Sequence, residues 1–217
     1  LLSDQKILES LIPENIVVIG RTTLSRSTNN FIKSAKNLIV IDPRISEIDS
    51  KREGNLLLPA LPAEVKSSKI DVAIWEKASD IAAAEIATIK WSEQLAIISI
   101  CESLPDQSAL FVGSSRPVRD VEAFCHPRSG IDVFANRGLA GIDGNLSTIF
   151  GIAREFQNTY AISGDLTFLH DISALTNSAS ENIRIYVIDN NGGAIFSTLP
   201  QAGVDNFDQL FGTPHNL

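Results

Sequence analysis

Residues 160–193 read YAISGDLTFLHDISALTNSASENIRIYVIDNNGG, and they contain two apolar runs that each lead into a polar turn. Residues 160–163 lead into Gly164-Asp165, and residues 183–188 lead into Asp189-Asn190. Short apolar runs bounded by turn residues are typical of buried strands, and a helix-length segment separates these two. Because neighbouring parallel strands end at the same edge of a sheet, we expect Asp165 and Asn190 to lie at one ligand crevice.

The residue types at this crevice suit a divalent cation that carries a diphosphate. Mg²⁺ prefers hard oxygen donors and shares its coordination shell with phosphate oxygens. Asp165, Asn190 and the carbonyl of Gly192 supply a carboxylate, an amide oxygen and a backbone oxygen. Gly-Asp and Asn-Gly are common as ordinary turns. Their occurrence as a pair, each after an apolar run, favours a metal–diphosphate site over two unrelated turns.

The rest of the chain alternates between strand and helix patterns. The expected strands are residues 15–20, 37–42, 55–58, 108–112, 131–135, 160–162 and 183–188. The expected helices are residues 29–36, 118–124, 139–156 and 166–178, and residues 70–104 carry apolar residues at helical spacing. This order predicts an α/β fold with two doubly wound parallel-sheet domains, and we place their junction within or just before residues 70–104, near residue 80.

Composition excludes several classes of protein. The 217 residues are 44% hydrophobic and 20% charged, which predicts a folded globular chain, and the net charge of −8 argues against a nucleic-acid partner. Two cysteines, Cys101 and Cys125, fit reduced thiols in the cytoplasm. No apolar stretch reaches membrane-spanning length. There is no zinc-ligand spacing, Walker lysine loop or nucleophile elbow, and the sequence alone does not place His170 or His215.

Several segments carry a family resemblance. They are NRGLAGIDG (136–144), GDLTFLHD (164–171), NNGGAIF (190–196), FGTPH (211–215) and, more weakly, GRTTLSR (20–26). These segments closely resemble the thiamine-diphosphate enzymes, in particular their MenD group, which acts in menaquinone biosynthesis. Leu166 follows that group, because other thiamine-diphosphate enzymes have glycine there. Asp189 replaces the group's usual first asparagine, a position that is not a ligand in the family pattern.

The resemblance implies a transferase and its cofactors. The expected reaction decarboxylates 2-oxoglutarate on thiamine diphosphate with Mg²⁺ or Mn²⁺ and adds the succinyl unit to isochorismate. The expected product is 2-succinyl-5-enolpyruvyl-6-hydroxy-3-cyclohexene-1-carboxylate. Residues 1–80 correspond to part of a central domain, and residues 81–217 to a diphosphate-binding domain that is truncated at its C-terminus. The resemblance also implies a cytoplasmic homodimer or homotetramer with the cofactor at the subunit interface. We expect the chain alone to be inactive, because the activating glutamate belongs to another domain.

The resemblance also assigns roles to particular residues. The metal ligands are Asp165, Asn190 and Gly192. The cofactor-binding residues are Ile142, Gly164, Asp165, Leu166, Asn190, Gly192, Ile195 and Phe196. The substrate-binding residues are Ser115, Arg119, Arg137, Phe196, Leu199 and Arg26. Catalytic roles fall to Ile142, which holds thiamine diphosphate bent, and to Arg119 and Arg137, whose guanidinium groups match substrate carboxylates.

Other interpretations stay open at this point. The apolar residues Ile142, Ile195 and Phe196 are also compatible with plain core packing, and exposed arginines are often only solvated charges. The metal site is shared with other thiamine-diphosphate carboligases and 2-oxoacid decarboxylases, so discrimination rests on Arg119, Arg137 and residues 211–215. A noncatalytic module of the same fold is the remaining alternative.

Overall fold

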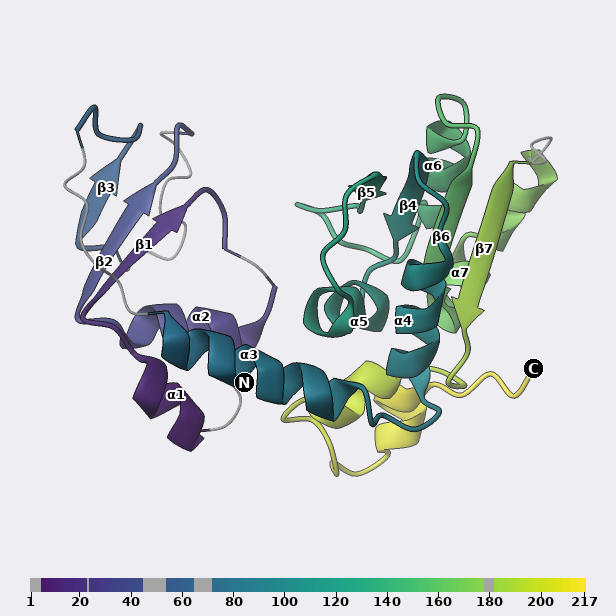
Figure 1. The fold of residues 1–217 in the computed structure, drawn as a ribbon. Helices are drawn as coiled ribbons and strands as arrows, with labels where there is room; N and C mark the ends of the chain where they lie inside the picture. The colour runs from purple at the N-terminus through teal and green to yellow at the C-terminus, as the bar shows by residue number, and fades with distance from the viewer. Residues whose placement is uncertain (1–4, 23, 45–53, 65–71, 178–181) are drawn as a thin grey trace. The chain divides into compact units, whose positions relative to one another are not determined.

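Two structural units, each built around a parallel sheet, make up the chain (Figure 1). The computed structural model describes residues 5–22, 24–44, 54–64, 72–177 and 182–217. Unit 1 is Leu1–Ile89 and unit 2 is Lys90–Leu217. The prediction of an α/β protein with two parallel sheets is confirmed. Within the described ranges, no helix has the length and apolar character needed to cross a bilayer.

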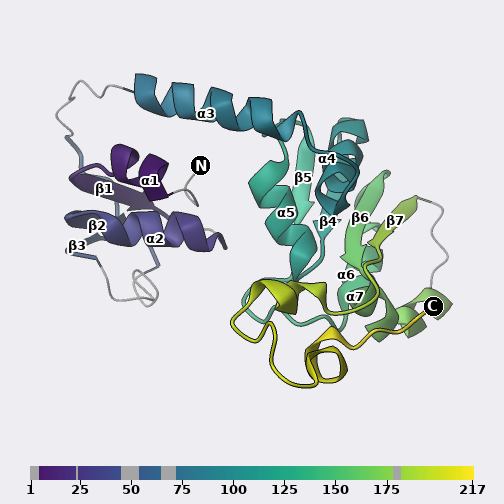
Figure 2. The same ribbon diagram turned by 90° about the horizontal axis from the view of Figure 1, so that it is seen from below.

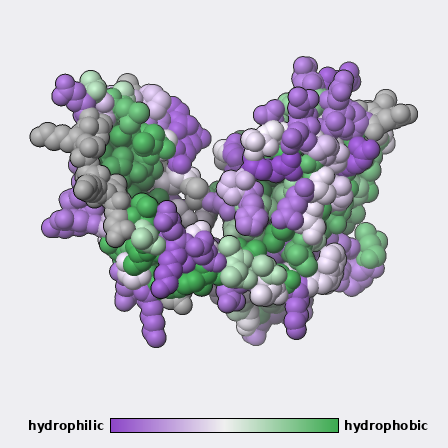
Figure 3. Space-filling view, viewed as in Figure 1, coloured by the Kyte–Doolittle hydropathy of each residue, from purple (hydrophilic) through white to green (hydrophobic). Residues whose placement is uncertain are grey.

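Unit 1 has a three-stranded sheet in the order β1-β2-β3. Its strands are β1 (Asn15–Ile19), β2 (Asn37–Ile41) and β3 (Leu56–Leu58), and its helices are α1 (Gln5–Leu11), α2 (Arg26–Ser34) and α3 (Ala73–Ile86). The sequence analysis did not anticipate α1. Val17 and Ile19 of β1 are exposed together with Leu56 and Leu57 of β3. Figure 3 shows a hydrophobic surface over this sheet.

The apolar segment 70–104 forms two helices, not one. Helix α3 ends at Ile86, and α4 (Glu93–Ser103) starts after Ser92, whose hydroxyl accepts a hydrogen bond from the Leu95 N–H at 3.3 Å. A serine at this position satisfies an N–H that has no partner inside the helix, and so favours a new helix start. Helix α3 runs unbroken through residue 80 and contacts α1, and the two compact units divide between Ile89 and Lys90, within the segment 70–104.

Unit 2 has a four-stranded parallel sheet in the order β5-β4-β6-β7. The strands are β4 (Ser108–Val112), β5 (Ile131–Phe134), β6 (Thr159–Gly164) and β7 (Ile183–Ile188). The helices are α4, α5 (Arg116–Phe124), α6 (Asn145–Ile152) and α7 (Asp165–His170). Every residue of β4 is buried, as expected for a central strand covered on both faces.

Side-chain alternation along β4 assigns the helices to the two faces of this sheet (Figures 1 and 2). Leu110 and Val112 pack with Ile97 of α4 and Val118 of α5, whereas Phe111 packs with α6 on the opposite face. Phe168 of α7, the helix that follows β6, also packs on the Phe111 side, so the chain leaves β4 and β6 toward opposite faces. In such sheets, ligands bind between the carboxyl ends of the two strands where the winding reverses. Ser115 follows β4 and Asp165 follows β6, so both reach this point.

Two helices in unit 2 are shorter than expected. Helix α6 starts at Asn145 instead of residue 139, because Gly138 and Gly144 adopt positive φ values of 97° and 67°, which end regular structure before the helix. The expected helix 166–178 is α7 followed by a 3₁₀ helix, Ile172–Asn177, and residue 178 lies outside the described residues. Residues 135–144 are therefore a long loop that carries Ile142 to the crevice.

Candidate functional site

A cavity of about 160 Å³ lies at the carboxyl ends of the strands in unit 2. All eight residues that the sequence analysis assigned to the cofactor line it, as does Ser115. These residues come from the turn after β4, the loop 135–144, the start of α7 and the turn after β7. A volume of this size exceeds what a single water needs, so the cavity has room for part of a larger ligand.

Asp165 is the buried acid of this cavity, with 5% of its surface exposed. Its Oδ1 accepts a hydrogen bond from the Leu166 N–H at 2.8 Å, and its Oδ2 accepts one from the Gly192 N–H at 2.7 Å. Burial alone raises the pKa of this carboxyl, but the bonds from Gly192, Leu166 and His215 outweigh burial, so its pKa lies below the ordinary value. The protein thus holds a negative charge at the crevice.

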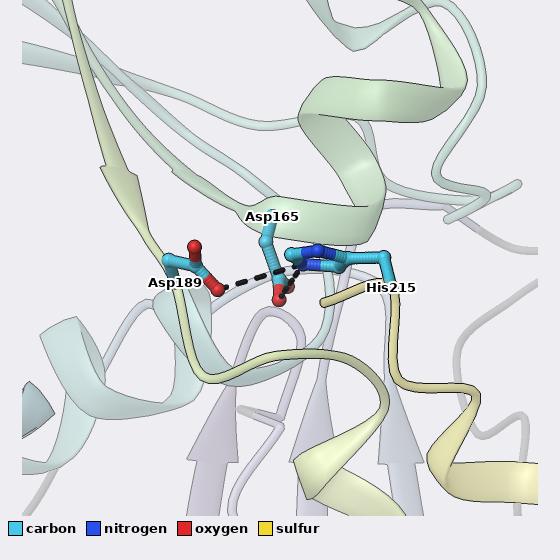
Figure 4. Close-up of side chains that lie close together, drawn as sticks. All are labelled: Asp165, Asp189 and His215. Atoms are coloured by element: carbon cyan, nitrogen blue, oxygen red, sulfur yellow. Dashed lines mark hydrogen bonds and ion pairs between the residues drawn. The ribbon is translucent and has the colours of Figure 1, made fainter. Parts of the chain in front are cut away.

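His215 reaches the same carboxylate, which sequence alone did not establish. The Leu217 N–H donates to Nδ1 of His215, so in the neutral ring Nε2 carries the proton. Nε2 lies 3.0 Å from Oδ2 of Asp165 and 3.5 Å from Oδ1 of Asp189 (Figure 4). The sequence signal that could have pointed to His215 is the motif FGTPH (211–215). Its position along the chain does not indicate that it packs on the turn after β7.

The turn after β7 and residues 211–216 hold each other in place. The Gly193 N–H donates to the Gly212 carbonyl at 2.6 Å. Oδ1 of Asn191 accepts from the backbone N–H groups of His215 and Asn216, at 3.1 and 2.8 Å. Gly192 has a φ of 129°, a conformation that side chains disfavour. Because residue 192 is a glycine, the backbone of the turn after β7 can contact the backbone of residues 211–216, and this contact places His215 beside Asp165.

Asn190 presents the second oxygen expected for a metal. Its Nδ2 donates to Oε2 of Glu93 at 3.2 Å. Its Oδ1 is buried and has no hydrogen-bond partner in the part of the chain that the structure describes. Buried polar atoms normally have a hydrogen-bond partner. A buried acceptor oxygen without such a partner, in the same cavity as Asp165, is therefore suited to bind a cation. Asp165, Asn190 and the adjacent Gly192 therefore fit Mg²⁺ or Mn²⁺. The sequence analysis missed Glu93, because 97 positions separate it from Asn190.

The expected substrate residues are less closely gathered. Ser115 lines the cavity at the start of α5, and Nη1 of the exposed Arg119 donates to its carbonyl at 2.6 Å. Of the described residues, neither Arg119, Arg137 nor Leu199 is part of the cavity lining, whereas Arg116 is. Arg26 begins α2 in unit 1, so its distance from this cavity is not defined.

Arg116 pairs with Asp120, one turn further along α5, at 3.4 Å. Asp120 is 3% exposed, and its Oδ2 has no hydrogen bond among the described residues. Burial raises the pKa of Asp120, against the opposing effect of Arg116. The folded protein therefore binds this proton more tightly than the unfolded chain. The contribution of Asp120 to the free energy of unfolding falls as the pH rises through the raised pKa.

This sign gives a stability prediction. Asp120→Asn removes the titrating group, so the stability of the variant relative to the wild type is expected to increase as the pH rises from about 4, the ordinary pKa of an aspartate, through the raised pKa of Asp120. Urea denaturation across that range measures the difference. Asp132→Asn is the control, because Asp132 is exposed on β5. A difference for Asp120→Asn that is constant with pH, or that decreases, contradicts the raised pKa.

Comparison with curated proteins finds relatives along most of the chain. The 2-succinyl-5-enolpyruvyl-6-hydroxy-3-cyclohexene-1-carboxylate synthase of Thermobifida fusca is 34% identical over 230 residues, which covers 94% of this chain and 40% of the relative. The enzyme of that name from Listeria monocytogenes serotype 4b is 31% identical, covering 100% of this chain and 41% of the relative. In Lysinibacillus sphaericus the identity is 41%, covering 67% of this chain and 27% of the relative.

The chain spans about two fifths of the length of the first of these relatives. No family model matches the chain.

Proposed function

Since this chain belongs to the 2-succinyl-5-enolpyruvyl-6-hydroxy-3-cyclohexene-1-carboxylate synthase family, we propose that its cavity binds thiamine diphosphate and Mg²⁺ or Mn²⁺. The reaction that we propose for the whole protein is decarboxylation of 2-oxoglutarate and transfer of the succinyl unit to isochorismate. The single observation that carries the proposal is the buried Oδ1 of Asn190, which lies in the same cavity as Asp165 and has no hydrogen-bond partner among the described residues. Bound thiamine diphosphate supplies the carbanion-stabilising chemistry.

In this proposal, the crevice needs a cation before it accepts a diphosphate. The carboxylates of Asp165 and Glu93 both line the cavity, so without a cation they disfavour an anionic ligand. The carboxylate of Asp165, Oδ1 of Asn190 and the carbonyl of Gly192 hold the metal. Their charge and hardness suit Mg²⁺ or Mn²⁺. The cation offsets the acidic crevice, which explains how a chain with a net charge of −8 binds a diphosphate.

The apolar wall of the cavity has a separate role. Ile142, Ile195 and Phe196 line it, and Phe196 packs on Phe211 with ring centroids 5.6 Å apart. We propose that these side chains exclude water from the reacting end of the cofactor, where a low dielectric favours the neutral reactive form. Ile142 is β-branched and has few rotamers, so it suits the role of a rigid support beneath the cofactor.

We propose that the substrate carboxylates bind at the edge of the cavity beyond Ser115. Arg119 donates a hydrogen bond to the carbonyl of Ser115, and Arg137 lies in the loop 135–144 that also carries Ile142. A guanidinium group pairs with a carboxylate through two parallel hydrogen bonds. Both side chains are exposed, so they are available to an incoming dicarboxylate. Arg26 and Leu199 complete the proposed substrate contacts. We propose a cytoplasmic homodimer or homotetramer with the cofactor between subunits.

Calorimetry on the purified protein tests the cofactor proposal. Thiamine diphosphate is expected to bind in the presence of Mg²⁺, and a chelator is expected to abolish the binding. A coupled assay of the full-length protein with 2-oxoglutarate and isochorismate, against pyruvate as the alternative donor, tests the substrates. If thiamine diphosphate binds equally well with and without Mg²⁺, the result argues for a noncatalytic module. Turnover of pyruvate in preference to 2-oxoglutarate identifies a different carboligase or decarboxylase.

A further inference from the structure

Glu93 is the one acidic side chain that α4 brings to the cavity. It is the first residue of α4, and Ile97 and Cys101 follow it at intervals of one helical turn. Ile97 is fully buried, and Cys101 is 9% exposed; both pack on the sheet residues Leu110 and Ile162. Residues at this spacing share one helix face, so the packing that buries Ile97 also directs Glu93 toward the end of the sheet.

At that position Glu93 contacts Asn190 and determines how its amide is turned. A carboxylate only accepts hydrogen bonds, so the Asn190 atom that faces Oε2 of Glu93 must be the NH₂ group. The oxygen of the amide then points elsewhere, and it is the buried Oδ1 that has no partner among the described residues. In the flipped orientation, Oδ1 would face another oxygen and the NH₂ group would lose its acceptor. Glu93 therefore selects the orientation that presents an oxygen.

We infer that Glu93 is a positioning residue of the metal site, which acts by holding the amide of Asn190 with Oδ1 turned toward the cation. The inference rests on the proposed function, because it needs Asn190 to be a metal ligand. Groups that orient a ligand in this way strongly affect metal affinity although they do not touch the metal. The inference also explains why an acidic residue is found in a cavity that accepts a diphosphate: its hydrogen bond to Asn190 favours binding of the cation.

A plainer role for Glu93 makes different predictions. An acidic residue in the first turn of a helix is favourable because it faces the positive end of the helix dipole. If that were its whole contribution, replacing it would lower the stability of α4 and leave metal affinity unchanged. A purely electrostatic attraction for the cation is a third possibility. It predicts that loss of charge alone weakens metal binding, whether or not a hydrogen-bond acceptor remains.

Two replacements separate these roles. Glu93→Leu removes the acceptor, and Glu93→Gln keeps an acceptor oxygen for Nδ2 of Asn190 while it removes the charge. Mn²⁺ is titrated into the purified protein with thiamine diphosphate present, and free Mn²⁺ is followed by electron paramagnetic resonance. We expect Glu93→Leu to weaken Mn²⁺ binding about 10–100-fold and Glu93→Gln to stay within a few-fold of wild type. Glu102→Gln, at an exposed position of the same helix, is the matched control.

The outcomes are distinguishable. Unchanged Mn²⁺ affinity in Glu93→Leu overturns the inference and leaves the helix-dipole role. Equal weakening in both Glu93 variants overturns it in favour of simple charge attraction. If Glu93→Leu does not fold, Glu93→Gln decides alone. A several-fold or greater loss of Mn²⁺ affinity in folded Glu93→Gln then overturns the inference, whereas near wild-type Mn²⁺ affinity in that variant supports the role of Glu93 as a hydrogen-bond acceptor. Failure of the wild-type protein to bind Mn²⁺ contradicts the proposed function itself.

Discussion

Asp165→Asn is expected to weaken metal-dependent binding of thiamine diphosphate at least about 100-fold. Loss of a residue that only hydrogen-bonds to a metal ligand already weakens metal binding by up to about 100-fold. The replacement removes the negative charge of the Asp165 side chain and turns one of its acceptor oxygens into a donor. If the new NH₂ group takes the place of Oδ2, it meets the Gly192 N–H and the proton on Nε2 of His215. If it takes the place of Oδ1, it meets the Leu166 N–H instead. Either orientation places donor against donor.

Calorimetry with thiamine diphosphate and Mg²⁺ measures this effect, with unfolding followed in parallel. Leaving a buried backbone N–H without its acceptor costs about 1–3 kcal/mol, so the folded variant is also expected to be less stable. Asp189→Asn is the matched control. The Asp189 side chain is 53% exposed, and an asparagine oxygen still accepts from the Asn191 N–H, so its binding should stay close to wild type. Equal binding by Asp165→Asn and wild type would remove Asp165 from the metal site.

The sequence predicts the strands of this fold because each strand is a short apolar run with its own turn residues. The run 183–188 and the strand β7 have the same bounds, and 108–112 is β4. Asp165 and Asn190 could be placed at one crevice for the same reason, since parallel strands deliver their ends to one edge. Local pattern and global fold agree at these positions, which makes them predictable.

The remaining features depend on contacts between distant segments. The break between α3 and α4 is stabilised by Ser92, which caps the start of α4. The helical spacing of apolar residues alone does not reveal this cap. The start of α6 depends on backbone conformations at Gly138 and Gly144. Glu93 and His215 reach the crevice because α4 packs on the sheet and because residues 211–216 fold onto the turn after β7. None of these contacts leaves a periodic signal near the residues that make it.

Gly192→Ala is expected to destabilise the turn after β7 by about 2–5 kcal/mol, from backbone strain together with overpacking. The φ of Gly192 is 129°, and a Cβ at this position would overlap the carbonyl oxygen of Gly212 and lie 3.0 Å from that of Thr213. These are backbone atoms, and the hydrogen bond from the Gly193 N–H to Gly212 holds them in place. To accommodate the methyl group, the two segments must separate, which withdraws both the Gly192 N–H and His215 from Asp165.

Hydrogen–deuterium exchange of peptides that cover β6, β7 and residues 211–217 measures this separation, because exchange reports the local free energy of opening. Faster exchange in these peptides, with loss of metal-dependent thiamine diphosphate binding, is the expected result. Gly151→Ala is the control within the same unit. Gly151 lies inside α6 at an exposed position, and a Cβ there meets no atom within 4 Å among the described residues. Because Gly151 is the last residue but one of α6, the replacement should leave stability close to wild type, at most about 0.5–1 kcal/mol higher, which is the gain that alanine gives in a helix interior. Wild-type exchange in Gly192→Ala would mean that the turn adapts without separating from Gly212, and the proposed coupling between this turn and Asp165 would fail.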